Sequence, residues 1–165
     1  MPDSPGSSYE ELLFSAGCSP GVIAHCKAVS RIADEYAERT GIADPSLVHE
    51  GAMLHDIGRG KTHSIRHAQE GSRICRDLGL PEAVALLVER HIGAGMTSDE
   101  CTLAGLLPIN CVPESLEEKI VANADNLVRG RHRISIYTRL GSSFFLSRKV
   151  RKRMYRLWLE MEQFP

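Results

Sequence analysis

The sequence predicts an all-α fold, a helical bundle of about six or seven helices. Three observations lead to this prediction. Apolar residues recur every three or four positions through most of the chain, helix-capping residues bracket these stretches, and no run alternates polar and apolar residues as a strand does. With 165 residues, of which 42% are apolar and 25% are charged, the chain can bury a core as one compact domain.

Capping residues place the expected helices in order along the chain. Ser7 or Ser8, each followed by a glutamate three residues later, favours a capping box at the first helix. Ser19-Pro20 and Asp44-Pro45 open the next two helices, because proline is tolerated at the first helical position. The expected helices lie at about 8–16, 20–40, 45–58, 63–78, 81–91, 115–129 and 144–162, with residues 93–114 forming mostly a connection that contains a short helical turn at 98–106.

The charge distribution divides the chain into an acidic part and a basic part. Residues 1–128 carry 10 Lys and Arg against 19 Asp and Glu, whereas residues 129–156 carry 10 Lys and Arg and no acidic residue. The basic stretch could attract phosphate or nucleic acid. We favour the alternative of a solvated helix face that pairs with acidic helices of the same fold, because charge runs alone specify little.

No membrane, targeting or disulfide pattern is evident in the sequence. No run of about 18 apolar residues could span a bilayer, and residues 1–6 lack the basic and apolar regions of a signal peptide. The five cysteines are scattered without a Cys-x-x-Cys pair, so we interpret them as small apolar fillers. We therefore expect a cytoplasmic protein without a membrane partner, and the sequence does not indicate its oligomeric state.

Polar residues interrupt three of the predicted apolar helix faces. His25 lies among valines at helical spacing, His55-Asp56 follows an apolar run, and Asp125 shares a face with valines. An ionised carboxylate buried without a partner costs several kcal/mol. For one isolated Asp or His, an arginine ion pair or a hydrogen-bonded core histidine is the simpler interpretation. As a set on several helices, imidazoles and carboxylates favour a site for divalent metal.

These residues resemble the H…HD…D pattern of the HD superfamily of metal-dependent phosphohydrolases. The His-Asp-Ile-Gly sequence at 55–58 resembles the HDIG branch of that family, and Ala-Asp-Asn at 124–126 resembles its closing motif. The resemblance covers about residues 20–130. It implies that residues 1–165 form a single HD domain, with residues 131–165 as a basic helical extension packed on the core.

The resemblance also implies two divalent metal ions. His67-Ala-Gln-Glu-Gly71 is similar to an element of the family's two-metal members, and His91 follows in the expected order. It implies that one ion is held by His25, His55, Asp56 and Asp125, and the other by His67, His91 and Asp56. Asp56 would then bridge the two ions. The sequence does not distinguish Mn, Fe, Co, Ni, Zn or Mg.

The implied activity is cleavage of a phosphate ester or phosphoanhydride of a nucleotide by a metal-activated water molecule. We expect Asp56, Arg59 and Arg129 to act in catalysis, with Arg129 one helical turn after Asp125 on the same face. Phosphate binding is expected at Arg59, Lys61, His63, Arg66 and Arg129. Simple solvent exposure is the alternative for Lys61 and Arg66, and helix capping is the alternative for His63.

The sequence identifies the substrate less well than the metal ligands. No aromatic residue is obviously placed beside the ligand motifs to stack on a base. The bacterial symmetrical dinucleoside tetraphosphate hydrolases are similar in size and ligand order, whereas the Gly-Tyr-Pro element of cyclic dinucleotide phosphodiesterases is missing. Two other classes stay open: a metal-stabilised nucleic-acid-binding or regulatory domain that uses residues 129–156, and a di-iron oxygenase.

Overall fold

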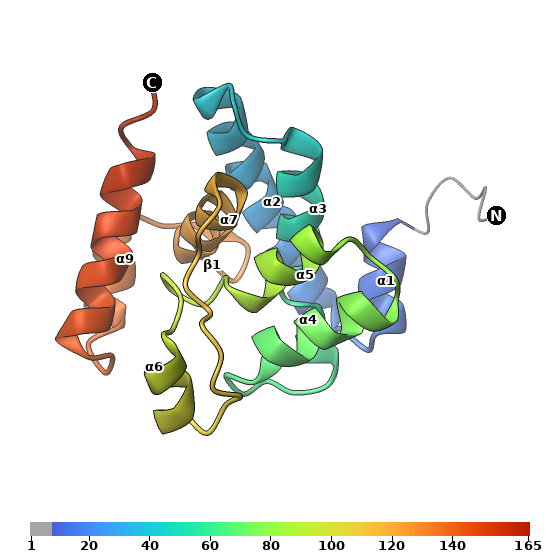
Figure 1. The fold of residues 1–165 in the computed structure, drawn as a ribbon. Helices are drawn as coiled ribbons and strands as arrows, with labels where there is room; N and C mark the ends of the chain where they lie inside the picture. The colour runs from blue at the N-terminus through green and yellow to red at the C-terminus, as the bar shows by residue number, and fades with distance from the viewer. Residues whose placement is uncertain (1–7) are drawn as a thin grey trace.

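The computed structural model describes residues 8–165, and within them it is an all-α protein (Figure 1). The sequence prediction of the fold class is confirmed. The elements are α1 (Tyr9–Ser15), α2 (Pro20–Thr40), α3 (Pro45–Leu54), the 3₁₀ helix η1 (Ile57–Gly60), α4 (His67–Asp77), α5 (Glu82–Glu89), α6 (Ser98–Leu103), α7 (Leu116–Asn126), the antiparallel pair β1 (Val128–Arg129) and β2 (His132–Arg133), α8 (Ile136–Ser142) and α9 (Arg148–Met161).

The expected capping residues begin and end the helices. Ser8 forms a capping box with Glu11 at α1, and Ser115 forms another at α7. Ser7, the alternative first cap, lies outside the described residues. Asp44 accepts hydrogen bonds from two backbone N–H groups at the start of α3. Gly41 ends α2 in the left-handed conformation (φ 63°), as a helix-terminating glycine does.

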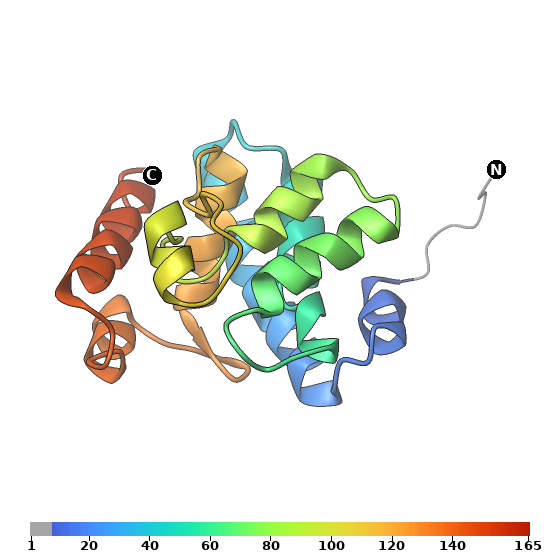
Figure 2. The same ribbon diagram turned by 60° about the horizontal axis from the view of Figure 1, so that its bottom comes forward.

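Helix α2 lies at the centre of the bundle and packs against α3 and α7, while α3 contacts α5 and α5 pairs with α4 (Figures 1 and 2). Two apolar clusters result. One joins α2, α7 and α9 around Tyr36, Ile120 and Met161, and the other joins α1, α3, η1 and α5 around Leu13 and Leu54. The histidine and aspartate side chains predicted as ligands come from the elements that form these two clusters.

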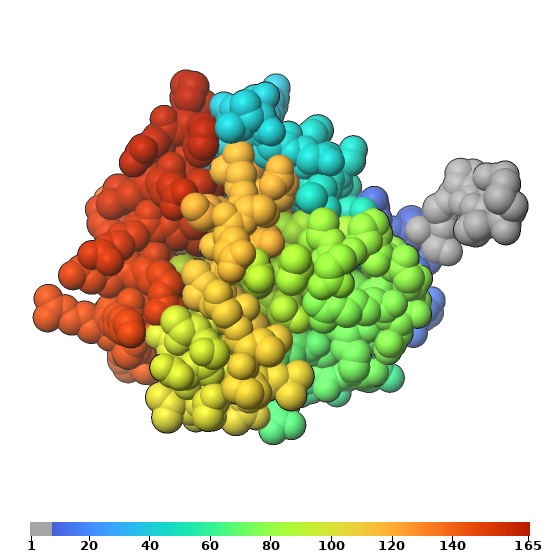
Figure 3. Space-filling model, viewed as in Figure 1, coloured from blue at the N-terminus to red at the C-terminus, as the bar shows by residue number. Residues whose placement is uncertain are grey.

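The C-terminal helices cover one side of the bundle. Helix α9 packs on α7 through Met154, Leu157 and Met161, and α8 contacts α9 (Figure 2). In the space-filling view this segment, coloured orange to red, forms the left flank, next to the segment that contains α6 (Figure 3). Arg153 pairs with Glu100 at 2.9 Å. Part of the basic stretch is thus used in ion pairs within the fold, as the favoured alternative expected.

Several element boundaries differ from the sequence prediction. The helix expected over 45–58 ends at Leu54, and α4 begins at His67 instead of residue 63. The helix expected over 115–129 ends at Asn126, because the chain turns at Gly130 (φ 58°) and forms the β1–β2 hairpin. Helix α8 was missed, α9 begins only at Arg148, and the short helical turn expected at 98–106 is α6. Residues 8–165 therefore contain nine α-helices, two more than the seven expected helices.

The cysteine side chains lie in the interior, as their interpretation as apolar fillers expects. The five cysteines, Cys18, Cys26, Cys75, Cys101 and Cys111, are buried and free. Among residues 8–165, no helix combines the length and the apolar character needed to cross a membrane.

Candidate metal centre

Glycines in the two histidine motifs allow their backbones to meet. A Cβ atom at residue 58 would lie 1.8 Å from the carbonyl oxygen of His67 and 2.7 Å from the backbone nitrogen of Gly71. A Cβ atom at residue 71 would in turn lie 3.0 Å from the nitrogen of Gly58. Only glycine permits so close an approach of η1 to α4. The contact brings Asp56, at the start of η1, next to His67, at the start of α4.

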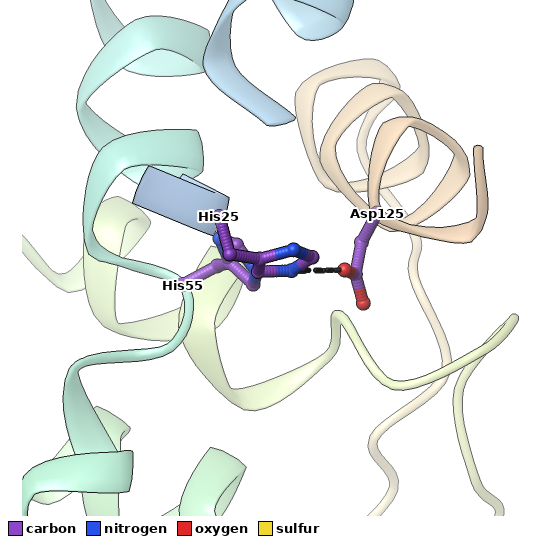
Figure 4. Close-up of side chains that lie close together, drawn as sticks. All are labelled: His25, His55 and Asp125. Atoms are coloured by element: carbon purple, nitrogen blue, oxygen red, sulfur yellow. Dashed lines mark hydrogen bonds and ion pairs between the residues drawn. The ribbon is translucent and has the colours of Figure 1, made fainter. Parts of the chain in front are cut away.

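The first group of ligand candidates joins three elements. His25 lies on α2, His55 directly follows α3, and Asp125 lies on α7; both imidazoles point toward the Asp125 carboxylate (Figure 4). Oδ1 of Asp125 is 3.0 Å from Nε2 of His25 and 3.5 Å from Nε2 of His55. The Asp56 Oδ2 atom lies 3.8 Å from each of the same two nitrogens. The structure therefore brings together the four residues expected to hold one ion.

The second group lies on the other side of Asp56. Its Oδ1 atom is 3.1 Å from Nε2 of His67 and 3.5 Å from Nε2 of His91, and these two nitrogens are 3.2 Å apart. His91 follows the end of α5. Each carboxylate oxygen of Asp56 thus faces a different pair of imidazoles, which is the arrangement a bridging ligand requires.

A backbone carbonyl orients each of the four imidazoles. Since a carbonyl oxygen only accepts hydrogen bonds, the Nδ1 atom of each ring must carry a proton, so a ring without a second proton presents an Nε2 lone pair to the centre. The nitrogens of His67 and His91 therefore face each other as two acceptors, and only a cation or an added proton reconciles them. The contacts are His25 to Gly130 O at 2.6 Å, His55 to Ala52 O at 2.7 Å, His67 to Ser64 O at 2.8 Å and His91 to Val88 O at 2.7 Å.

The electrostatics of the centre favour a cation. Burial alone would raise the pKa of the Asp56 carboxyl. The imidazoles of His55, His67 and His91 outweigh burial and hold this pKa well below its ordinary value. Burial likewise raises the pKa of the Asp125 carboxyl, but the adjacent imidazoles of His25 and His55 outweigh burial and hold this pKa well below its ordinary value. Burial lowers the pKa of His55, yet the Asp56 charge raises it well above its usual range. Both carboxylates therefore stay ionised and attract positive charge.

The residues present fit a divalent metal. Nε2 of His55 and Oδ1 of Asp56 are buried and have no hydrogen-bond partner among the described residues. Unpartnered buried polar atoms are rare and costly, so they indicate a missing ligand. Imidazole nitrogen and carboxylate oxygen are the donors that first-row divalent ions take. Two groups, His25 with His55 and Asp125, and His55 with Asp56 and His91, have donor atoms close enough to share an ion.

A cavity of about 530 Å³ opens over this cluster. The lining includes four of the ligand candidates, three arginines and an apolar wall from the loop after His91 and from the region of α8 and α9. The polar lining consists of His25, His67, His91, Asp125, Arg59, Arg129, Arg139, Glu100, Asn126 and Ser143, and the apolar wall includes Ile92, Met96, Phe145, Leu146, Val150 and Met154. The candidate metal ligands that line this cavity are therefore accessible to a small molecule.

The structure brings only part of the predicted phosphate-binding set to this cavity. Arg59 and Arg129 line it. Arg129 reaches it from β1, not from the next turn of α7 as expected, because α7 ends before it. The side chains of Lys61, His63 and Arg66 are exposed and are not part of the lining, and Arg66 donates to the carbonyl oxygen of Gly105 at 3.2 Å.

Arg59 bridges the centre and the cavity. Its Nε donates to Oδ2 of Asp56 at 2.9 Å, and its Nη1 donates to the carbonyl oxygen of His63 at 3.3 Å. The ion pair considered as the alternative for a buried aspartate thus exists at Asp56, but it involves only one of the two carboxylate oxygens. The remaining N–H groups of the guanidinium are available to a phosphate.

Replacing Arg59 should impair catalysis without removing metal. For Arg59→Ala we expect kcat/KM to fall about tenfold, because one charge-assisted contact to phosphate is lost. Steady-state kinetics and elemental analysis of the same preparation measure both quantities. Arg66→Ala is the matched control and should leave kcat/KM unchanged. An unchanged kcat/KM in Arg59→Ala would remove this guanidinium from the site.

Arg139 was missed by the sequence analysis and anchors the element that carries Asp125. From α8, its Nε donates to the carbonyl oxygen of Asn126 at 2.8 Å, and its Nη2 donates to those of Asp125, at 3.3 Å, and Val128. Asp125 and Asn126 lie in the last turn of α7, where carbonyl oxygens lack the next helical N–H, and Val128 begins β1. No sequence signal links residue 139 to residue 125, since the contact depends on how α8 packs.

Replacing Arg139 should loosen the metal centre. Arg139→Ala removes three hydrogen bonds to backbone carbonyl oxygens, at a cost of about 1–3 kcal/mol in the free energy of unfolding. We expect metal affinity to fall about tenfold, the size typical of losing a residue that orients a ligand. Urea unfolding and metal titration test this, with Arg133→Ala, an exposed arginine paired with Glu35, as the control. Unaltered metal affinity in Arg139→Ala would argue against the anchoring role.

Fold and centre together define an all-α protein built around a cluster of four histidines and two aspartates. The HD domain model matches residues 22–130 of the chain. The chain belongs to the HD domain family, as its motifs led us to expect. HD domains bind divalent metals, and the His/Asp groups described above could hold one.

Individual relatives differ in their overall organisation. The chain is 50% identical over 123 residues to an uncharacterized protein of Methanocaldococcus jannaschii, covering 72% of this chain and 73% of the relative. It is 45% identical over 136 residues to a tRNA (cytidine(56)-2'-O)-methyltransferase of Thermoplasma volcanium, covering 82% of this chain but only 39% of that enzyme. The matched region is therefore a minor part of the methyltransferase.

A solved structure shares the fold. The HD domain of the L. monocytogenes phosphodiesterase PgpH superposes with a TM-score of 0.58 at 15% identity, over 96% of this chain and 98% of that one. A second structure of the same domain contains cyclic-di-AMP.

Proposed function

We propose that this protein is a metal-dependent phosphohydrolase that cleaves a phosphate ester or phosphoanhydride of a nucleotide. The observation that carries the proposal is the placement of Asp56 between two pairs of imidazoles, beside a cavity that three of those imidazoles and three arginines line. Carboxylate and imidazole donors suit divalent ions, and guanidinium groups suit phosphate. The phosphodiesterase name of the PgpH domain, which shares the fold, is consistent with this chemistry.

Each part of the site would have a separate task in this reaction. His25, His55, Asp125 and Asp56 would hold one ion, and His67, His91 and Asp56 the other. Divalent ions bound there supply a Lewis acid for the phosphoryl oxygens and acidify a water molecule. The carbonyl-bound imidazoles keep their Nε2 atoms directed at the centre. Arg59 and Arg129 would bind phosphate oxygens and hold phosphorus in line for attack.

A nucleotide fits the cavity in size and charge. The volume of about 530 Å³ lies within the usual range of small-molecule sites. The neighbouring fold in PgpH was solved with cyclic-di-AMP, a dinucleotide. Symmetrical dinucleoside tetraphosphates belong in the substrate panel because of the size and motif order noted above.

Metal content and phosphate release test the proposed function directly. Protein purified without chelator would be examined by elemental analysis and assayed with a nucleotide panel plus Mn²⁺, Co²⁺ or Fe²⁺. We expect close to two metal ions per chain and release from at least one nucleotide, abolished by chelation and restored by metal. Metal-free protein with no turnover under any of these conditions would refute the proposal.

The two-metal arrangement makes a separate prediction for His91. His91→Ala should lower the stoichiometry from two ions to one, because this residue contacts only the Oδ1 side of Asp56. The measurement is metal per chain after dialysis against metal-free buffer. His49→Ala is the control, since His49 pairs with Asp34 away from the cavity. Equal stoichiometry in His91→Ala and the wild type would contradict the assignment of two ions.

A nucleic-acid-binding domain is the second candidate. It is favoured by the relative that is a tRNA methyltransferase and by basic residues that the fold leaves exposed. Binding of RNA that weakens steeply with salt, without hydrolysis of any phosphate ester, would support this candidate over the hydrolase. The exposed basic residues are Arg131, Arg148, Lys149, Lys152 and Arg156.

A further inference from the structure

An apolar wall forms part of the lining of the cavity that opens over the metal ligands. It combines residues of the α8–α9 region, Phe145, Val150 and Met154, with Met96 from the loop after His91. An apolar wall cannot bind a phosphate group, because phosphate oxygens require positive charge and hydrogen-bond donors. The cavity therefore fits a molecule with a phosphate and an apolar portion.

Phe145 contributes an exposed aromatic ring to this lining. Its side chain is 75% exposed, although it lies beside a cavity with several apolar residues. Its neighbour Phe144 is 77% exposed, meets the Phe145 ring edge to face, and is not part of the lining. Exposed aromatic surface is unfavourable in water and gains when a ligand covers it. The ring of Phe145 is thus placed to cover a flat ligand.

Polar groups beside Phe145 favour a flat heterocycle over an aliphatic chain. Ser143 lines the cavity, is 5% exposed, and carries a hydroxyl that can both donate and accept a hydrogen bond. Asn126 also lines the cavity and is held in place by donating to the carbonyl oxygen of Gly93. An aliphatic chain would leave the Ser143 hydroxyl unsatisfied. A nucleobase has an apolar face that can cover the Phe145 ring and edges that can hydrogen-bond with the Ser143 hydroxyl.

We propose that Phe145 stacks on the base of a nucleotide whose phosphate lies at the metal centre, and that Ser143 contacts the edge of this base. The proposal rests on the proposed function in placing the phosphate at the metal centre. It makes Phe145 a specificity-determining residue: it selects phosphates that carry a base. The sequence analysis found no aromatic residue obviously placed beside the ligand motifs, and Phe145 reaches the cavity from a segment outside them.

Two phosphates that differ by the base test this stacking. Equilibrium dialysis of the Mn²⁺-loaded full chain would compare adenosine monophosphate with ribose 5-phosphate. We expect the wild type to bind adenosine monophosphate at least about tenfold more tightly, as stacking on an aromatic ring provides. Phe145→Ala should remove this preference and leave ribose 5-phosphate binding unchanged. Phe145→Trp should keep the preference, and so should Phe144→Ala, the matched control.

Three results would overturn the proposal. One is a preference that survives in Phe145→Ala, and another is equal binding of both phosphates by the wild type. The third is that Phe145→Ala weakens the binding of hexyl phosphate as much as that of adenosine monophosphate, which would show that Phe145 is part of a general apolar surface. Hydrolysis of phosphate esters without base preference would leave the hydrolase intact and remove only the stacking role. Base-dependent binding without any hydrolysis would keep the stacking role and refute the proposed hydrolase activity.

Discussion

Asp56→Ala is expected to remove both metal ions and to lower kcat/KM at least about 10³-fold. Among residues 8–165, Asp56 is the residue whose two oxygens face both imidazole pairs, so its loss affects both candidate ion sites at once. Metal ions contribute several kcal/mol of transition-state stabilisation in such sites, and about 4 kcal/mol corresponds to this factor. Elemental analysis and kinetics on one preparation measure the two effects together.

The matched control for this variant is Asp34→Ala. Asp34 is a half-exposed carboxylate that pairs with His49 at 2.9 Å and lies outside the cavity. It should leave metal content and activity unchanged. The thermal midpoint of metal-free Asp56→Ala should stay near that of the metal-free wild type, which separates loss of the centre from loss of the fold. Retention of two ions by Asp56→Ala would disprove the bridging role.

Gly58→Ala is expected to have the largest effect on stability. The added Cβ would lie 1.8 Å from the carbonyl oxygen of His67 and 2.7 Å from the backbone nitrogen of Gly71. These two atoms belong to the backbone, so no side-chain rotation can relieve the overlap. Overpacking of this kind costs about 3 kcal/mol or more in the free energy of unfolding. Separation of η1 from α4 would also pull Asp56 away from His67, so metal binding should weaken as well.

Urea unfolding and metal titration of Gly58→Ala measure these two effects. Gly21→Ala provides the comparison, because a Cβ at that position of α2 would meet only the Ser19 hydroxyl, at 3.7 Å. Alanine is preferred to glycine in a helix by about 0.5–1 kcal/mol, so this variant should be as stable as the wild type or more so. A Gly58→Ala protein with wild-type stability would mean that the two motif glycines do not need their close contact.

Local signals in the sequence were sufficient for most of the helices and for the list of metal-ligand candidates. Capping boxes and Ser-Pro or Asp-Pro starts act within four residues, so they can be recognised without the fold. The fold class and the family followed from them and from the order of the histidines and aspartates, and both are confirmed. Helix α8 was missed because it has a single buried residue, Ile136, and so no apolar periodicity.

Only the tertiary structure decided how these residues meet. It showed which oxygen of Asp56 faces which imidazoles, and that Gly58 and Gly71 touch. It excluded the side chains of Lys61, His63 and Arg66 from the cavity lining, and it added Arg139 and Phe145. The reason is physical: ligand type and helix caps are properties of short segments, whereas contacts between residues far apart in sequence arise when helices pack and their apolar faces are buried.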